Sequence, residues 1–399
     1  MSPSTSGSQS PGAPAPGWRL GPAARRPWMV FHAPYPLDPD PTSASRLRPL
    51  RMRAAFSEIG YEVFDLSGTV PQRRRAFAAL RARLDDGQRP AFHYMENSTQ
   101  PNALATSLRS GVAPHLEQAI LAHLRRAGVP LGVFYRDAYW RTPMGRSTGL
   151  RGLILPLLQR ADLRGYRRKQ VHFFLPSQRM AGLVGLDETD FFSALPPAGD
   201  EGRILPLPQA EQGLRLLYVG GLGAHYDLTE FLTALPAAPS AHLDLVTRAE
   251  QWQGALAAQP ALAELGLGVH HLSSSELAPL YAQAHVGVLA VKPSEYRDIA
   301  VPVKLFEYLS YGRPVIATRG TEAGRIIEAN GAGWVVDHNR QAFIDLLRHL
   351  EQEPGEVRDR AEAARAAAAA HTWAARARQA ALVLAPQSLA LVKGGTPIT

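Results

Sequence analysis

The sequence contains no cysteine, so it can form neither disulfide bonds nor thiolate metal sites. It has no run of 18 or more apolar residues, so it predicts no transmembrane helix. Its 13 histidines include no pair at a metal-binding spacing such as HExxH, and we therefore expect no catalytic metal and no cofactor. These absences favour a protein of the reducing cytoplasm, while contact with the inner face of the cell membrane stays open.

Lysine is scarce, and the basic charge is unevenly distributed. Only four of the 43 basic residues are lysine, and residues 1–200 contain 26 Lys and Arg against 15 Asp and Glu. Such a basic half indicates an anionic partner (a membrane surface, a nucleic acid or a phosphorylated substrate), unless the arginines are simply solvated. Nucleic acid is the least favoured partner, because the basic residues are dispersed and no known binding motif occurs.

Two segments mix basic and apolar residues, Arg73–Arg83 and Gly149–Gln170. Both could lie on an anionic membrane surface. The favoured alternative is that they are amphipathic helices whose apolar face belongs to a core.

Short apolar runs alternate with helical patterns in two series. The first series of expected strands is Trp28–His32, Glu62–Leu66, Ala91–Met95, Leu131–Tyr135 and Val171–Leu175. The second, after the connector Leu205–Gly213, is Leu214–Val219, His242–Thr247, Gly268–Leu272, Val286–Ala290, Pro314–Thr318 and Gly333–Val336. This alternation predicts the α/β class, with two doubly wound parallel sheets in tandem.

The domain boundaries follow from these series. We expect a disordered tail at residues 1–26, an N-terminal domain at 27–206, a C-terminal domain at 207–385 and a flexible tail at 386–399. The C-terminal domain would include an alanine-rich terminal helix, Glu356 to about Leu384. Ligands of such sheets bind beyond the carboxyl ends of the strands, so a cleft between the domains is the expected site.

One short helix carries a candidate anion site. Pro302 suits the first turn of a helix and Gly312 suits its end, which predicts a helix over about Val303–Tyr311. Its free N–H groups attract an anion, and Lys304 adds a full charge there. Glu307 lies on the same face and could accept hydrogen bonds from ribose hydroxyls. From spacing alone, an ordinary surface ion pair is equally favoured.

The residues around this helix are similar to a known signature. VPVKLFEYLSYGRPVI, at 301–316, resembles the nucleotide-sugar signature of GT-B glycosyltransferases of the family 4 kind. The resemblance continues in Leu216–Leu228 and Gly320–Val336 of the C-terminal half, and it is weaker in Phe134–Arg141 and His172–Met180 of the N-terminal half. The resemblance implies two Rossmann-like domains facing across a cleft. It also implies transfer of a sugar from a nucleoside-diphosphate donor such as a UDP-sugar to a hydroxyl of a glycan acceptor, lipid-linked or not, in bacterial polysaccharide biosynthesis. Glu307 would then bind the donor ribose.

The sequence departs from the family at one place. Retaining members carry two glutamates separated by seven residues, and counting back from Glu307 gives Ile299 at the first place. Glu295 and Asp298 lie nearby but out of register. The residue that holds the donor sugar, and the choice between retention and inversion, therefore stay open.

Further candidates lie where strands end. For the donor they are Gly221 and Gly223 in a glycine-rich turn, Lys292, Arg248 and Glu295. Glycines let the backbone approach a diphosphate closely, although a tight turn would need them too.

Asp137, with Arg136 as a candidate partner, could act as the catalytic base toward the acceptor hydroxyl. His93 and Glu96 are rival bases, and His32 is a weaker one. The alternative for Asp137 is that it caps the next turn, and the alternative for the histidines is a structural role. Two other functions stay open, a nucleotide-sugar 2-epimerase and a non-catalytic nucleotide or glycan binder, because fold alone does not fix function.

Overall fold

The chain forms two α/β domains, each built on a six-stranded parallel sheet, in a computed structural model that describes residues 26–38, 44–106, 111–142, 149–209, 213–223 and 226–392. The first sheet contains β1 (Trp28–His32), β2 (Glu62–Leu66), β3 (His93–Glu96), β4 (Leu131–Phe134), β5 (His172–Leu175) and β6 (Phe191–Ala194). The second contains β7 (Leu214–Val219), β8 (Ala241–Val246), β9 (Gly268–His270), β10 (Val286–Leu289), β11 (Val315–Thr318) and β12 (Gly333–Val336). The predicted fold class, two doubly wound parallel sheets, is confirmed.

Both sheets reverse their strand order near the middle. The orders are β2-β1-β3-β4-β5-β6 and β12-β11-β10-β7-β8-β9. The reversal in the second sheet falls between β7 and β10, and ligands of open α/β sheets bind at such a switch point. The glycine-rich turn follows β7 directly.

Helices cover both faces of each sheet, as a parallel sheet requires. The N-terminal domain has α1 (Ala44–Glu58), α2 (Val70–Asp85), α3 (Leu116–Arg126), α4 (Gly149–Arg168) and α5 (Met180–Val184). The C-terminal domain has α6 (Thr229–Leu232), α7 (Ala249–Ala258), α8 (Ala278–Gln283), α9 (Val303–Ser310), α10 (Glu322–Asn330), α11 (Arg340–Gln352) and α12 (Pro354–Ala370). The chain ends in α13 (Trp373–Leu384) and α14 (Pro386–Leu389).

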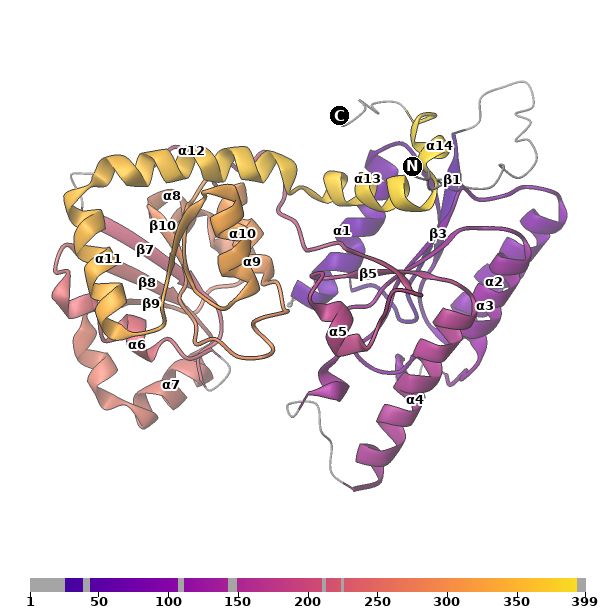
Figure 1. The fold of residues 1–399 in the computed structure, drawn as a ribbon, viewed down its shortest axis with the longest axis horizontal. Coiled ribbons are helices and arrows are strands. Elements are labelled where there is room, and N and C mark those ends of the chain that lie inside the picture. The colour runs from indigo at the N-terminus through magenta and orange to yellow at the C-terminus, as the bar shows by residue number, and fades with distance from the viewer. Residues whose placement is uncertain are drawn as a thin grey trace, which may run out of the picture.

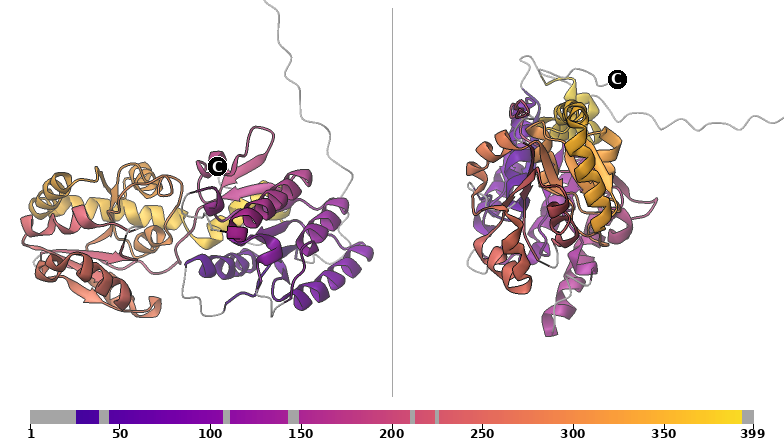
Figure 2. Two further views of the ribbon diagram at one scale, coloured as in Figure 1. Left: turned by 90° about the horizontal axis from the view of Figure 1, so that it is seen from below. Right: turned by 90° about the vertical axis from the view of Figure 1, so that its left-hand side faces the viewer.

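The C-terminal helices differ from the sequence prediction. The expected helix from Glu356 to Leu384 is two helices, because Thr372 adopts an extended conformation and its side chain caps α13 at Ala375 N. Figure 1 shows α12 running along the C-terminal domain toward the N-terminal one, where α13 lies beside α1, and Figure 2 shows the same crossing from below. The helix that we expected in the C-terminal domain thus ends in the N-terminal one.

Apolar packing explains this return. Met52 and Phe56 of α1 and Phe31 of β1 form one core cluster with buried residues of α13, namely Trp373, Ala374, Ala377, Ala380, Ala381 and Leu384. Small alanine side chains let two helices approach closely, so α13 closes the face of the sheet that α1 leaves uncovered. The sequence analysis also missed β6, in which Phe191 is exposed and the other side chains are only partly buried.

Candidate active site

Helix α9 is held tightly against the second sheet. Its buried residues Leu305, Phe306, Tyr308 and Leu309 face the core. The Tyr308 hydroxyl accepts a hydrogen bond of 2.9 Å from the backbone N–H of Val219, at the end of β7. Gly287 in β10 permits this approach, since a Cβ there would lie 2.5 Å from the Tyr308 ring. The helix mouth is therefore fixed beside the glycine-rich turn.

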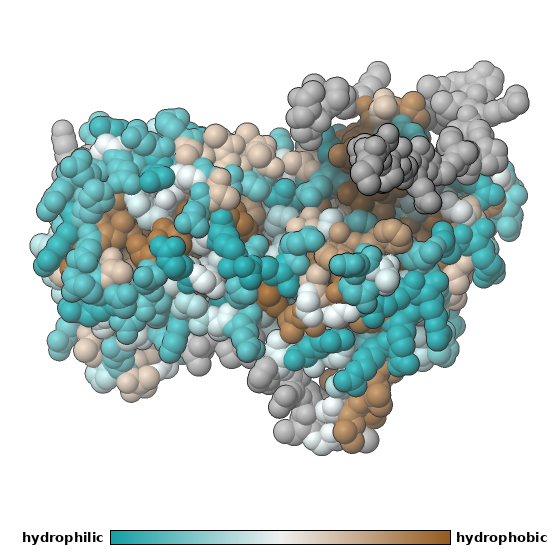
Figure 3. Space-filling model, in the orientation of Figure 1, coloured by the Kyte–Doolittle hydropathy of each residue, from teal (hydrophilic) through white to brown (hydrophobic). Residues whose placement is uncertain are grey.

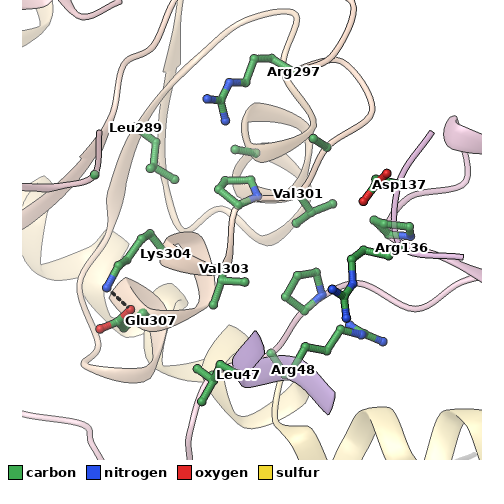
Figure 4. A pocket seen from close by; sticks show the side chains of 18 of the residues that line it. Leu47, Arg48, Arg136, Asp137, Leu289, Arg297, Val301, Val303, Lys304 and Glu307 are labelled. Atoms are coloured by element: carbon green, nitrogen blue, oxygen red, sulfur yellow. Dashed lines mark hydrogen bonds and ion pairs between the residues drawn. The ribbon is translucent and has the colours of Figure 1, made fainter. Parts of the chain in front are cut away.

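The opposite face of α9 carries the two charged residues that the sequence singled out. Lys304 Nζ lies 2.5 Å from Glu307 Oε2, and both side chains are partly exposed and line a cavity. Figure 4 shows the pair at one side of that cavity. The helix begins at Val303, with Pro302 as the residue before it, so its first N–H groups open toward the same space. An ammonium and a helix N-terminus thus converge there, with a carboxylate one turn further on.

The glycine-rich turn forms the next part of the wall. Gly220 and Gly221 line the cavity, and a Cβ on Gly221 would lie 3.0 Å from the Tyr226 ring. Gly223 has a φ of 121° with open space around it, so the backbone conformation requires glycine there. Gly223 does not line the cavity. Of the two predicted glycines, the structure brings only Gly221 to the site.

Two cavities join at this point. The first, of about 730 Å³, lies between the domains and is lined from both of them. The second, of about 720 Å³, lies in the C-terminal domain and includes Thr247, Arg248 and His271. Both share Gly220, Gly221, Tyr226 and Lys304 in their walls. A ligand that reaches through both would pass the mouth of α9, with Arg248 at its far end.

The N-terminal wall of the first cavity contains Asp137, which follows β4. Figure 4 shows its carboxylate on the side of the cavity away from Lys304 and Glu307. Asp137 Oδ2 accepts a hydrogen bond of 2.5 Å from Thr99 Oγ1. Burial raises the pKa of Asp137 above its usual value. Its carboxylate is thus a stronger proton acceptor than an exposed one.

Aromatic rings cross the cleft next to Asp137. Tyr139 and Tyr296, from opposite domains, stack with ring centroids 4.9 Å apart, and their hydroxyl oxygens are 2.6 Å apart. The Arg297 guanidinium lies 4.5 Å from the ring centre of Tyr226. The tyrosine pair therefore brings the loop after β10 against the N-terminal domain, next to the turn that contains Asp137.

His93 and Glu96, the rival bases, do not line either cavity. Both are fully buried. His93 Nε2 lies 3.1 Å from Nδ1 of His32. Glu96 Oε1 accepts hydrogen bonds from Arg48 Nε at 3.1 Å and from the Tyr94 hydroxyl at 2.7 Å. Because neither side chain lines a cavity, and a base must reach the acceptor proton, structural roles are favoured for both.

Two donor candidates also point elsewhere. Lys292 and Glu295 are exposed and are not among the described residues that line the cavities. The backbone N–H of Lys292 donates to the carbonyl of Asp227 at 2.9 Å. The loop after β10 turns these side chains outward and presents Tyr296 and Arg297 to the cavity instead.

Ile299 does line the cavity, at the place where retaining relatives carry a glutamate. Its carbonyl accepts a hydrogen bond of 2.6 Å from Ser177 Oγ in the other domain. Asp298 is bound by Arg325 at 2.7 Å and Arg179 at 3.4 Å, and it does not line the cavity. An apolar side chain therefore occupies the place of the first glutamate.

Sequence reasoning missed several residues of the N-terminal wall. Arg48 and Arg51 of α1 and Arg203 after β6 line the cavity. The only sequence signal was the basic run RLRPLRMR at 46–53, which does not show which side chains face the cleft.

Two searches of the described part of the chain were negative. It contains no group of three or more His, Asp or Glu side chains placed to hold a metal ion. None of its helices is both long and apolar enough to cross a membrane.

Comparisons with known proteins agree with this architecture. Residues 213–353 match the family model described as Glycosyl transferases group 1. Sucrose-phosphate synthase from Thermosynechococcus elongatus has a similar structure, with a TM-score of 0.61 and 13% identity, over 90% of this chain and 98% of that one. Anabaena HepE, solved in complex with UDP and glucose, is also similar, with a TM-score of 0.59 and 14% sequence identity. The match covers 90% of this chain and 100% of that one.

WaaG, a glycosyltransferase involved in lipopolysaccharide biosynthesis, gives a TM-score of 0.54 at 16% identity, over 92% of this chain and 100% of that one. A search of curated proteins found no match. The chain thus has the GT-B fold, and the expected resemblance to GT-B glycosyltransferases of the family 4 kind is confirmed.

Proposed function

We propose that this GT-B protein transfers a sugar from a nucleoside-diphosphate sugar to a hydroxyl of a glycan acceptor. The observation that carries the proposal is the mouth of α9, where Lys304, Glu307 and the glycine-rich turn meet two joined cavities. The family match over the same domain supports a nucleotide-sugar donor, as does HepE, which was solved with UDP-glucose. The nucleotide occupies the second cavity, near Arg248, and the diphosphate reaches the helix mouth.

The reaction exchanges one bond at the anomeric carbon. The acceptor oxygen bonds to that carbon while the bond from the carbon to the diphosphate oxygen breaks, and its electron pair leaves with the diphosphate. Lys304 and the helix N-terminus stabilise the charge that develops there, in a cleft whose walls limit water. We propose that these fixed charges suffice without a metal ion.

The hydroxyl proton passes to a base on the N-terminal side, and Asp137 is our candidate. Its raised pKa and its position across from α9 support this role. A base opposite the leaving group belongs to an inverting mechanism. Loss of transfer in Asp137→Asn, together with an inverted anomeric configuration of the product by NMR, is the result that we expect.

We also propose a lipid-linked acceptor in bacterial polysaccharide biosynthesis, reached at the inner face of the cell membrane. Helix α4 exposes Leu153, Ile154 and Leu157 by 69%, 42% and 57%. Figure 3 shows an apolar patch at the free end of this helix. Exposed Arg160 and Arg164 follow on the same helix, a combination that suits an anionic bilayer.

A thermal-shift panel tests the donor site first. It compares UDP, GDP, dTDP, CMP and their sugar conjugates on the wild type and Glu307→Ala. A ligand that binds only the native state raises the melting temperature with occupancy. Stabilisation by one diphosphate series, lost in the variant, would support the proposal. No stabilisation by any compound would contradict it and favour a non-catalytic protein.

Activity on the donor separates the remaining alternatives. Slow hydrolysis of the sugar nucleotide without acceptor counts against a non-catalytic binder. Conversion of the donor to its 2-epimer without acceptor would identify an epimerase and refute transfer. The N-terminal wall of the cavity supports transfer, because an epimerase needs no acceptor site.

A further inference from the structure

The N-terminal wall of the first cavity carries more positive than negative charge. Arg51 of α1, Arg136 after β4 and Arg203 after β6 line it from three separate segments. The donor diphosphate is already met by Lys304 and the glycine-rich turn in the other domain. These three arginines are therefore left without a role in donor binding.

Two of them share a single carboxylate. Asp200 Oδ2 lies 2.8 Å from Arg51 Nη2 and 2.5 Å from Arg203 Nη2. The arginine side chains are 41% and 37% exposed. Because each guanidinium has five N–H donors, most of them remain available to a ligand. This trio has one uncompensated positive charge.

Arg136 is the third member, and it has no ion pair with a described carboxylate. Its Nη2 donates to the Tyr35 hydroxyl at 2.6 Å, but its Nε is buried without a hydrogen-bond partner among the described residues. A buried donor without an acceptor is costly, and such groups often mark a ligand site. Figure 4 shows Arg136 on the cavity wall beside Arg48, whose own charge is compensated by Glu96.

These charges define the ligand. Three arginines (Arg51, Arg136 and Arg203) face two carboxylates, Asp200 and Asp137, on this wall, so a net positive charge remains that attracts an anion such as a phosphate monoester. Planar guanidinium groups bind phosphate oxygens through paired hydrogen bonds. We propose that Arg51, Arg136 and Arg203 form a phosphate subsite for the acceptor, which places the acceptor hydroxyl near Asp137. This inference rests on the proposed transfer function and specifies its acceptor as phosphorylated.

Calorimetry with inorganic phosphate and pyrophosphate tests the subsite directly. The protein is first saturated with UDP, so that the donor diphosphate site is occupied. We expect either anion to bind the wild type, and Arg136→Gln to weaken that binding at least tenfold while the Kd for UDP stays the same. Arg136→Lys keeps the positive charge but loses the planar guanidinium with its paired N–H donors, so an intermediate affinity for the anion is expected.

A matched pair of variants on α1 provides the control. Arg51→Gln should weaken anion binding. Arg53→Gln should not, although Arg53 is equally exposed at 41% and is also paired, with Asp65 at 2.5 Å. Arg53 does not line the cavity. Melting temperatures of all variants establish that they fold.

Three results would overturn the subsite: no anion binding to the UDP-saturated protein, equal binding in wild type and Arg136→Gln, or equal weakening in Arg51→Gln and Arg53→Gln. Glucuronate at the same concentration tests the class of anion, and binding as tight as that of phosphate would refute the phosphate assignment. Failure of every nucleotide in the thermal-shift panel to bind would refute the proposed function instead. In that case phosphate titration of the free protein and of Lys304→Ala still tests the arginine site.

Discussion

Replacing Glu307 by alanine should separate donor binding from folding. The side chain is 17% exposed, and its ion-pair partner is Lys304, one helical turn away. Pairs at this spacing stabilise a helix by roughly 0.2–0.5 kcal/mol, and alanine is the best helix former. We therefore expect Glu307→Ala to change the melting temperature by less than about 2 °C.

The effect on the donor should be much larger. Hydrogen bonds to a charged group contribute about 1.5–3 kcal/mol when the partner is lost. If Glu307 accepts from the ribose hydroxyls, the Kd for the nucleotide sugar should rise about 10- to 150-fold. Isothermal titration with the sugar nucleotide selected by the thermal-shift panel measures this change.

A matched control comes from α12. Glu362 Oε1 lies 2.5 Å from Arg365 Nη1 at the same spacing, but Glu362 is 71% exposed and lines neither cavity. Glu362→Ala should leave the donor Kd unchanged. An unchanged Kd in Glu307→Ala would refute the ribose role of Glu307 and leave it as an ordinary helix pair.

Four other outcomes are expected. Lys304→Ala should weaken binding of the nucleoside diphosphate more than binding of the nucleoside, since only the diphosphate meets the ammonium; equal weakening by calorimetry would contradict this. Transfer should persist in EDTA, because fixed cations hold the leaving group, and a loss restored by Mg²⁺ would show that a metal is needed. Leu153→Ser with Leu157→Ser should reduce sedimentation with phosphatidylglycerol vesicles, whereas Leu382→Ser, a 53% exposed leucine on α13, should not. Burial lowers the pKa of His93 from 6.5 to about 3, so only the unfolded state takes up this proton as the pH falls between those values. The free energy of unfolding should therefore fall by up to about 1.4 kcal/mol per pH unit from this group. Urea denaturation at several pH values measures this dependence. In His93→Gln the free energy of unfolding should fall less steeply as the pH is lowered, and an identical dependence on pH would refute the lowered pKa of His93.

Local patterns predicted the sheets well, because β-branched and aromatic runs between turn residues make buried strands recognisable. Trp28–His32, Glu62–Leu66 and Leu214–Val219 were predicted to the residue. The helix that presents Lys304 and Glu307 was also predicted, since Pro302 and Gly312 mark its ends. At Gly312 the φ of 71° shows why glycine is needed to turn into β11.

Long-range packing was not predictable in the same way. The alanine-rich composition predicts a helix but did not lead us to expect two helices separated at Thr372. It also does not indicate that Ala377 packs on the first domain. Arg136 and Arg203 are 67 residues apart in the sequence, and only the folded cleft brings both to one wall. For the same reason the sequence could not show that His93 is buried, because a polar residue near a strand end can face inward.

The return of α13 to the first domain also sets the order in which the protein can be completed during synthesis. Met52 and Phe56 leave the ribosome early, but the helix that covers them ends at Leu384. Between Ala194 and Trp373 lie roughly 180 residues, which take on the order of 10 to 40 s to synthesise at 5–20 residues per second. The C-terminal domain, whose core is contiguous in sequence, can therefore finish folding before the N-terminal one. Until then the N-terminal domain presents an uncovered apolar face to other nascent chains and to chaperones, and the final step of folding is the docking of a small-residue helix onto it.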